Sequence, residues 1–320
     1  MKPEPSEFLS GSDGDPGGGA RLLARRLRDR VLDARARGAA ERLDELAATA
    51  PERDVLVLAV YRRDGGLLPA AAAQLRDSRH RVRFALGAME ERAQALADIT
   101  VAVGLNAGKF ENLNALLHPR KGSDPVTGAS QVGEVVTGSD PVKALGGLTP
   151  IPAGRGRAEA GAADWTLVVD DDVVLPDRFL DRLLGVAEHH DLALAQPAQS
   201  LASHAAWPVT RRRPGALLRE TRFVEIGPVT LFRRDALEAL TPFPPLRYGW
   251  GLDLHWAAVA EERGWRLGIV DALAVRHESG RVAGTYSSCE AIEEAREFLA
   301  ERPFLDSDAA QETKRVHPLR

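Results

Sequence analysis

Short apolar runs alternate with helical segments along the middle of the chain, and this alternation limits the folds open to it. The first run, residues 55–60, reads Val-Leu-Val-Leu-Ala-Val and has no polar position. Such a strand is typical of a parallel sheet buried on both faces. Repeated strand–helix–strand units predict an α/β fold with a doubly wound, mostly parallel sheet and flanking helices. Further strands are predicted at residues 82–86, 99–103, 165–169, 192–195, 225–232, 266–270 and 273–276, and helices at 67–75, 89–98, 110–117, 176–188, 235–240, 253–263 and 287–301.

An apolar residue at every fourth position marks a helix near the N-terminus. Leu23, Leu27 and Val31 have this spacing, with Arg and acidic residues between them. The stripe suits a helix packed on the main domain or, alternatively, one lying on a membrane surface. We expect this helix to precede the α/β domain in the chain.

Two stretches lack any periodic pattern. Residues 1–19 are rich in Gly, Pro and Ser, and residues 118–163 contain Gly-Ser-Asp-Pro-Val twice. Such compositions predict disorder at the N-terminus and a flexible insertion, or alternatively a substrate lid, in the middle. The predicted divisions are a disordered segment at 1–19, a helix at 20–50, a domain at 51–305 with an insertion at 118–163, and a tail at 306–320.

The charge and cysteine content exclude several classes of protein. The 320 residues carry 46 acids and 42 bases, a net charge of −4, so we expect no nucleic-acid partner. The absence of an apolar run of about 18 residues predicts no membrane span. The N-terminus has no apolar signal region, and Cys289 is the single cysteine, which excludes an internal disulfide. We therefore expect a cytoplasmic protein.

Three aspartates follow the apolar strand at 165–169 directly. Ligands bind open α/β sheets beyond the carboxyl ends of the strands. Because side chains alternate along an extended chain, Asp170 and Asp172 should point to one side and Asp171 to the other. Two carboxylates on one side fit a divalent cation that holds a diphosphate. The alternative is a solvated turn that caps the next helix.

This run resembles the Asp-x-Asp motif of nucleotide-sugar-dependent glycosyltransferases of the GT-A fold, and the chain is similar to their family 2. Two upstream segments match the family as well, Tyr61-Arg62-Arg63 and Asn106-Ala107-Gly108-Lys109-Phe110-Glu111-Asn112. The resemblance implies a GT-A-like sheet. It also implies donor-binding roles for Tyr61, Arg62, Asn106, Gly108, Lys109, Asn112, Asp170 and Asp171.

The same resemblance implies a metal site. A histidine about two dozen residues after the catalytic acid completes it in the family, and His277 lies 24 residues after Asp253. The implied ligands are Asp170, Asp172 and His277, and the implied metal is Mn²⁺ or Mg²⁺, with the imidazole favouring Mn²⁺.

A glycine-flanked tryptophan precedes the candidate base. Gly249 and Gly251 allow a tight turn that presents Trp250 to a sugar ring. Asp253 can take a proton from an acceptor hydroxyl, or alternatively cap the following helix. Many members of the family have paired acids where this chain has Leu252-Asp253.

Glu225 is the second candidate acid. It lies in an apolar segment and needs a partner, because burying a bare carboxylate is costly. It is expected either to bind the acceptor or to form an ion pair with Arg222.

A more local resemblance covers the C-terminal half. Five short motifs occur in the same order in an uncharacterised family, known only as a domain of unknown function and suspected of glycosyl transfer. They are Gln196-Pro197-Ala198, Ser203-His204, Val209-Thr210-Arg211-Arg212, Phe223-Val224-Glu225-Ile226-Gly227-Pro228-Val229 and Gly249-Trp250-Gly251-Leu252-Asp253.

Together these features predict a metal-dependent, hexosyltransferase-like enzyme. It would move a sugar from a nucleoside-diphosphate sugar to an acceptor hydroxyl with inversion, the acceptor being unidentified. One alternative is a sugar nucleotidyltransferase, whose glycine-rich loop is only weakly matched by residues 62–66. Another is an inactive protein that binds sugar nucleotides.

Overall fold

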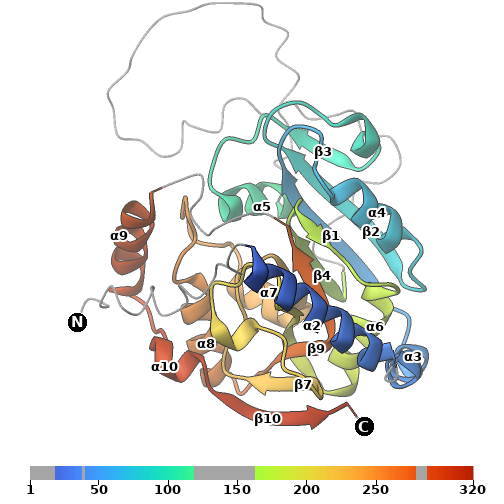
Figure 1. Cartoon of the computed structure of the whole chain (residues 1–320). Helices are drawn as coiled ribbons and strands as arrows, with labels where there is room; N and C mark the ends of the chain where they lie inside the picture. Colours follow the sequence, from blue (N-terminus) through green and yellow to red (C-terminus); the bar gives the residue numbers. More distant parts are fainter. Residues whose placement is uncertain (1–18, 38–39, 119–162, 279–286, 320) are drawn as a thin grey trace, which may run out of the picture.

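A ten-stranded sheet forms the framework of the protein. The computed structural model describes residues 19–37, 40–118, 163–278 and 287–319. The strand order is β10-β7-β9-β6-β8-β4-β1-β2-β3, so β10 and β3 are the two edges, and β5 pairs with the end of β9 (Figure 1). The strands are β1 Asp54–Tyr61, β2 Arg81–Ala88, β3 Thr100–Val103, β4 Trp165–Val169, β5 Val173–Val174, β6 Leu192–Gln199, β7 Ala216–Thr221, β8 Val229–Arg233, β9 Arg266–His277 and β10 Thr313–Pro318.

Most of these strands point the same way. β1 runs parallel to β2 and β4, β2 runs parallel to β3, and β6 runs parallel to β9. β8 and β7 are antiparallel to both of their neighbours. The carboxyl ends of β1, β4, β6 and β9 therefore meet at one edge of the sheet, where α/β proteins bind ligands.

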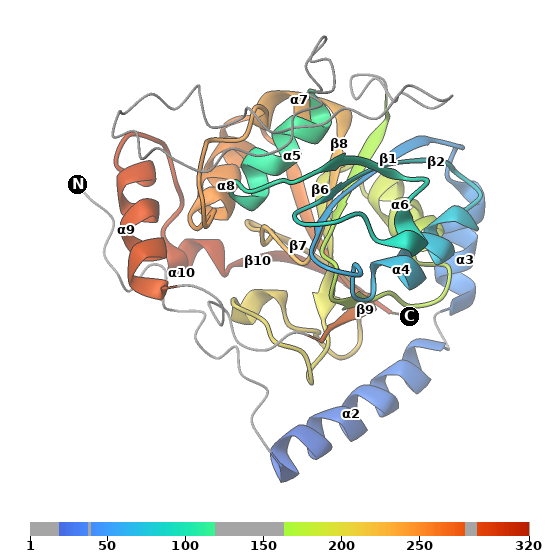
Figure 2. The same cartoon turned by 90° about the horizontal axis from the view of Figure 1, so that it is seen from above.

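Helices cover both faces of the sheet. Alternate residues of β1 contribute to two separate cores: Val55 and Val57 pack with α3, α4 and α6, whereas Leu56 and Leu58 pack with α5, α7, α8 and α9 (Figure 2). The predicted α/β architecture, a mostly parallel sheet with flanking helices and an N-terminal helix, is confirmed. The helices are α2 Ala20–Arg37, α3 Ala40–Thr49, α4 Leu68–Arg76, α5 Lys109–Leu117, α6 Phe179–His189, α7 Arg234–Leu240, α8 Leu252–Glu262, α9 Ser288–Leu299 and α10 Ser307–Ala310.

Several local predictions are wrong, each for a definable reason. The helix expected at 89–98 is only a 3₁₀ turn, Gln94–Leu96, because the N–H of Ala93 donates to the hydroxyl of Tyr61 instead of continuing a helix. The two strands expected at 266–276 are one strand, β9. Asp271 interrupts its apolar pattern, but Arg219 on β7 holds this buried carboxylate at 2.8 Å.

The range 306–320, expected to be a tail, instead contains α10 and β10. β10 pairs with β7 along the edge of the sheet. β10 is largely exposed and contains few apolar residues, so the hydrophobic pattern of its sequence does not predict a strand. β7 was not predicted either.

The N-terminal range 20–50 contains two helices, α2 and α3. The apolar stripe of α2 does not pack on the domain, since Leu23, Leu27 and Val31 are 61%, 50% and 51% exposed. The other face of α2 makes the contacts: Asp29 accepts the N–H groups of Leu201 and Ala202 at 2.9 and 2.8 Å.

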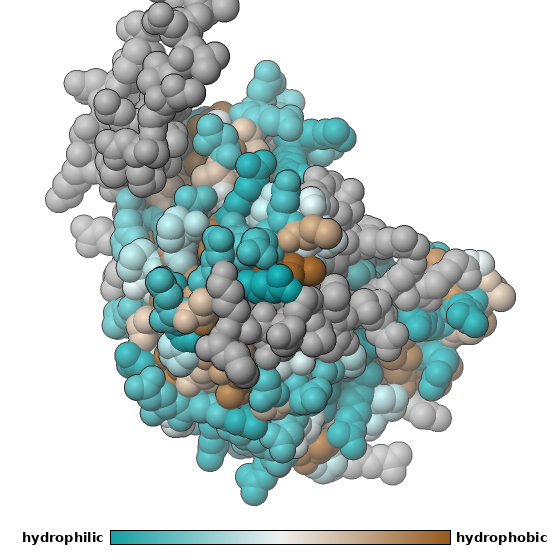
Figure 3. Space-filling model, turned by 90° about the vertical axis from the view of Figure 1, so that its left-hand side faces the viewer, coloured by the Kyte–Doolittle hydropathy of each residue, from teal (hydrophilic) through white to brown (hydrophobic). Residues whose placement is uncertain are grey.

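The two aperiodic stretches are outside the described residues. These cover neither residues 1–18 nor 119–162, so the predicted disorder and flexible insertion remain predictions. In the part of the chain that is described, no helix combines the length and apolar character needed to cross a bilayer. The surface on the side of α9 is mostly hydrophilic, with small apolar patches (Figure 3).

A close helix crossing gives a test of this packing. Gly185 of α6 meets α3 so closely that a Cβ atom there would lie 2.5 Å from the backbone nitrogen of Ala47. Gly185→Ala should therefore destabilise the protein by about 1–3 kcal/mol, although alanine favours a helix by about 1 kcal/mol. Urea unfolding measures this. A stabilised variant would contradict the described crossing.

Candidate active site

The three aspartates after β4 each contact a different neighbour. Asp170 forms an ion pair with Lys109 at the start of α5, with 2.6 Å between carboxylate and Nζ. The carboxylate of Asp171 accepts the backbone N–H of Arg62 at 3.1 Å, and that of Asp172 lies 3.1 Å from Nε2 of His277. The acidic segment is thus in contact with the loop after β1, with α5 and with β9.

Asp172 and His277 are aligned by the short strand β5. Val173 pairs with His277, and the N–H of Glu278 donates to the carbonyl oxygen of Asp172 at 2.9 Å. Burial lowers the pKa of His277, but the hydrogen bond and charge of Asp172, together with the charge of Asp170, outweigh burial and leave that pKa raised. The acids around His277 thus make this position more favourable for positive charge than water is for a free histidine, whether the charge is a proton or a metal ion.

Asp171 fastens the loop after β1 to this segment. Its carbonyl oxygen accepts the N–H of Leu67 at 2.7 Å. Burial, followed by the charges of Asp172 and Asp170, raises the pKa of Asp171, while the N–H of Arg62 opposes the shift. The Arg62 side chain is exposed and contacts Sδ of Met89 at 3.3 Å.

The predicted donor-binding turn before α5 is close by. The N–H of Gly108 donates to Glu111 at 3.0 Å, and a Cβ on Gly108 would lie 2.2 Å from the carbonyl oxygen of Leu246. Asn112 is buried and donates to the carbonyl oxygen of Ala107 at 2.9 Å, so it stabilises the turn. Asn106 is exposed.

Tyr61 does not belong to the accessible site. Its side chain is 0% exposed, and its hydroxyl lies 2.8 Å from that of Thr100 and accepts the N–H of Ala93. The prediction that the Tyr61 side chain contacts the sugar-nucleotide donor is therefore wrong, because its ring fills the core beneath the loop after β1. The prediction followed from the position of Tyr61 at the carboxyl end of a strand, where ligands usually bind.

The glycine-flanked turn forms as the sequence predicts. Gly249 and Gly251 have φ angles of +77° and +85°, and a Cβ on Gly249 would lie 2.8 Å from the ring of Phe110. Trp250 is partly exposed at the border of the core. Gly251 is the N-cap of α8, so the alternative in which Asp253 caps this helix is wrong.

Two buried carboxyl groups have strongly shifted pKa values. Burial raises the pKa of Asp253 to about 7, against the opposing hydrogen bonds from backbone N–H groups and the Trp207 side chain. Burial and the nearby charge of Asp253 raise the pKa of Glu225 to about 8, against the Thr210 hydroxyl and the charge of His277. Both carboxyl groups therefore change protonation state near neutral pH, where one of them can accept a proton and the other can donate one.

Glu225 does not form the ion pair expected with Arg222. Arg222 instead binds Glu261 and Glu312. The backbone N–H of Glu225 donates to the side-chain oxygen of Gln196. The Oε2 atom of Glu225 is buried and has no hydrogen-bond partner among the described residues. An acid in this state can donate to a substrate oxygen.

Sequence reasoning missed Trp207. This residue is buried, packs against Phe223 with 4.9 Å between ring centroids, and its side chain hydrogen-bonds to Asp253. It lies in an irregular loop where no periodicity signals its role. A tryptophan among prolines and small residues was the only available indication.

The implied metal ligands come together only in part. Asp172 and His277 face each other, whereas Asp170 is engaged by Lys109. The one cluster of three or more potential ligands within 4.8 Å, as far as the described ranges extend, is His190, Glu220 and His317. Asp172 and His277 therefore form a close pair with Asp170 beside it, and the implied three-ligand metal site remains a prediction.

Comparison with protein families gives one match. The model described as "Glycosyltransferase like family 2" matches residues 39–297, which is most of the chain. No curated protein matches the chain by sequence.

Solved structures give only distant likenesses. They include S. aureus TarS 1-349 in complex with UDP-GlcNAc (12% identity, TM-score 0.46, 80% of this chain and 68% of that one). GalNAc-T7 with UDP, GalNAc and Mn²⁺ has 10% identity and a TM-score of 0.46, covering 72% of this chain and 44% of that one. A mycobacterial protein has 14% identity and a TM-score of 0.44, covering 86% and 87%. At these values the likenesses assign no residue roles.

The shifted pKa of Asp253 has a consequence for stability. An unfolded aspartate titrates near 3.8, and the folded value is about 7. The stabilising contribution of this group is complete below pH 4 and is lost as the pH rises to about 7. Asp253→Asn cannot ionise, so it should melt about 2–5 °C above wild type at pH 8 and lose this advantage toward pH 4. Calorimetry at several pH values measures the difference.

The matched control is Asp98→Asn, which alters a largely exposed carboxylate paired with Arg76 on the surface. It should show no comparable gain at high pH. A melting difference for Asp253→Asn that is independent of pH would contradict the burial argument.

Proposed function

The chain belongs to the glycosyltransferase-like family 2, and from this premise we propose that it transfers a sugar from a nucleoside-diphosphate sugar to an acceptor hydroxyl, with inversion and with the help of a divalent metal. The observation that carries the proposal is the pair of buried acids, Asp253 and Glu225, with pKa values of about 7 and 8 beside the Asp172–His277 contact. We also propose the closer relationship to the uncharacterised family, which is supported by the order of the five motifs between residues 196 and 253.

The donor diphosphate is assigned to the edge where the acidic segment lies. Asp172 and His277 present a carboxylate oxygen and an imidazole nitrogen 3.1 Å apart, a donor set that suits Mn²⁺ better than Mg²⁺. A bound metal would act there as a Lewis acid toward the leaving diphosphate. Lys109 adds a cation that the donor can share with Asp170.

The acceptor is assigned to the neighbouring acids. Asp253 takes the proton of the acceptor hydroxyl, since burial raises its pKa to about 7, a value suited to a general base near neutral pH. Glu225, protonated, donates a hydrogen bond to a substrate oxygen through the carboxyl group whose Oε2 lacks a partner among the described residues. Trp250 offers a partly exposed ring against which a sugar can stack.

Donor binding should depend on Asp172. Asp172→Asn removes the carboxylate opposite His277 and should weaken binding of the preferred donor, chosen from UDP, GDP, CDP and dTDP sugars with Mn²⁺, by about tenfold or more. Isothermal titration calorimetry measures it. The surface variant Asp98→Asn should bind like wild type, and unchanged affinity in Asp172→Asn, with or without EDTA, would refute the assignment.

Asp253 should act on transfer and leave donor binding nearly unchanged. Asp253→Asn cannot accept a proton, so transfer should slow by about 10²–10⁴-fold while donor affinity stays close to wild type. The wild-type rate should rise with pH through about 7 as Asp253 ionises. Glu225→Gln keeps a neutral hydrogen-bond donor and should slow transfer less than Asp253→Asn does at pH 7.

Two results would contradict this assignment. Full transfer by Asp253→Asn would remove its role as the base. Formation of a nucleoside-diphosphate sugar from a nucleoside triphosphate and a sugar 1-phosphate would instead identify a nucleotidyltransferase.

A further inference from the structure

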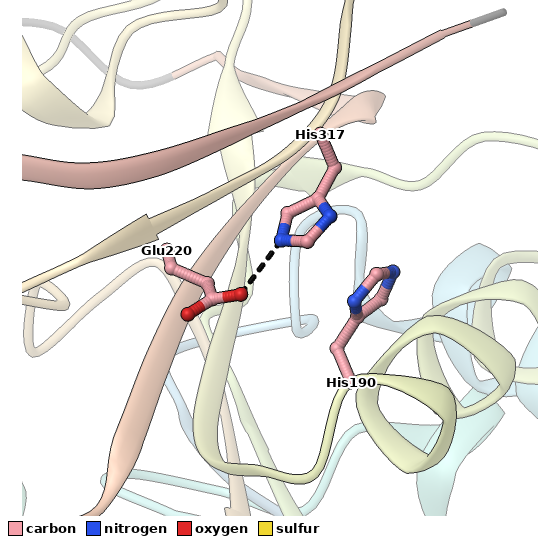
Figure 4. A group of neighbouring side chains, drawn as sticks. All are labelled: His190, Glu220 and His317. Carbon is pink, nitrogen blue, oxygen red and sulfur yellow. Dashed lines mark hydrogen bonds and ion pairs between the residues drawn. The ribbon is translucent and has the colours of Figure 1, made fainter.

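Three metal-ligand side chains from three separate elements meet on another part of the molecule. His190 follows the last turn of α6, Glu220 lies on β7, and His317 lies on β10 (Figure 4). One ligand atom from each lies within 4.8 Å of the other two. Nε2 of His317 is 2.6 Å from Oε1 of Glu220, and the two imidazole rings have centroids 4.3 Å apart.

This cluster is separate from the proposed active site. His190 lies two residues before the start of β6, and Glu220 pairs with Gly268 near the start of β9. The cluster therefore lies toward the amino ends of these two parallel strands, whereas Asp172 and His277 lie at the carboxyl end of β9. None of its three residues has a part in the proposed transfer reaction.

The surroundings suit a bound cation. The side chains of His317 and Glu220 are 20% and 14% exposed, so solvent competes only weakly for them. His190 is also only partly exposed. Arg266 donates to the backbone carbonyl oxygen of His190 at 3.2 Å, which holds the end of α6 next to the start of β9.

Two imidazoles and one carboxylate are a donor set that first-row transition metals use in proteins. Zn²⁺ accepts two His and one Glu with a fourth position open to water, whereas Mg²⁺ and Ca²⁺ prefer oxygen ligands throughout. The plain alternative is a hydrogen bond between His317 and Glu220 with no metal.

We propose that His190, Glu220 and His317 bind a divalent transition metal, with Zn²⁺ as the best fit, and that this ion joins the C-terminal strand to the body of the protein. β10 is an exposed edge strand whose pairing with β7 shifts register between His317 and Pro318. A metal held by His317, by Glu220 on β7 and by His190 at the end of α6 connects β10 to two other elements. The proposal does not depend on the transferase activity.

The test uses Zn²⁺ and the full chain. The Asp172→Asn background removes a ligand of the proposed active-site metal, so that zinc binding there does not obscure the result. In this background, calorimetry should show one zinc ion bound and a rise in melting temperature of roughly 3 °C or more at saturation, which Mg²⁺ does not reproduce. His190→Ala should lower the zinc affinity by at least about tenfold.

Two further measurements separate metal binding from a loss of folding. His118→Ala, which removes an exposed histidine at the end of α5, should bind zinc like its parent. Hydrogen exchange of the backbone amides in residues 313–317 should slow when zinc is added, and should not respond to zinc in His317→Ala, even if that variant is less stable without metal.

The proposal would be overturned if the His190→Ala and His317→Ala variants bound zinc with the same affinity as their Asp172→Asn parent and showed the same rise in melting temperature. It would also be overturned if the Asp172→Asn parent bound no zinc. Unchanged donor affinity in Asp172→Asn, together with intact zinc binding at this cluster, would count against the proposed function alone.

Discussion

The contact between Asp172 and His277 is the interaction on which the rest of the site depends. It joins the segment after β4 to the end of β9, two strands that β8 and β6 separate in the sheet. The short β5–β9 pairing fixes this contact in the backbone, so the neighbouring aspartates have defined directions. Asp170 then reaches α5 through Lys109, and Asp171 holds the loop after β1.

The electrostatics of this edge follow from an excess of acids. Asp170, Asp171 and Asp172 lie there with Glu225 nearby, and the described cations in contact with them are Lys109 and His277. Burial and the charges of neighbouring acids raise the pKa of Asp171 and Glu225, which disfavours the ionised forms of these two carboxyl groups. A divalent cation would offset the remaining negative charge of these aspartates and could also hold a diphosphate. Asp253, next to Glu225, is buried, and burial raises its pKa to about 7.

The apolar strands, the two-faced sheet and the position of the acidic segment could be predicted because they depend on local patterns. Residues 55–60 form a buried central strand in the structure, as their continuous apolar run predicts. The predictions that were wrong concern features that depend on contacts between segments far apart in the sequence. Asp271 breaks an apolar run yet lies inside β9 because Arg219 pairs with it, and β10 is held by its partner strand with little apolar sequence of its own. The sequence likewise cannot show that Tyr61 turns into the core or that Trp207 reaches Asp253.

A crystal structure with Mn²⁺ and a nucleoside-diphosphate sugar, with the metal located from its anomalous scattering, tests the central assignment most directly. The account predicts a manganese peak in contact with the Asp172 carboxylate and Nε2 of His277, with the donor diphosphate on the same ion and the sugar directed toward Asp253. A donor bound with its diphosphate away from this edge, or manganese found at His190, Glu220 and His317 and not at Asp172, would contradict it.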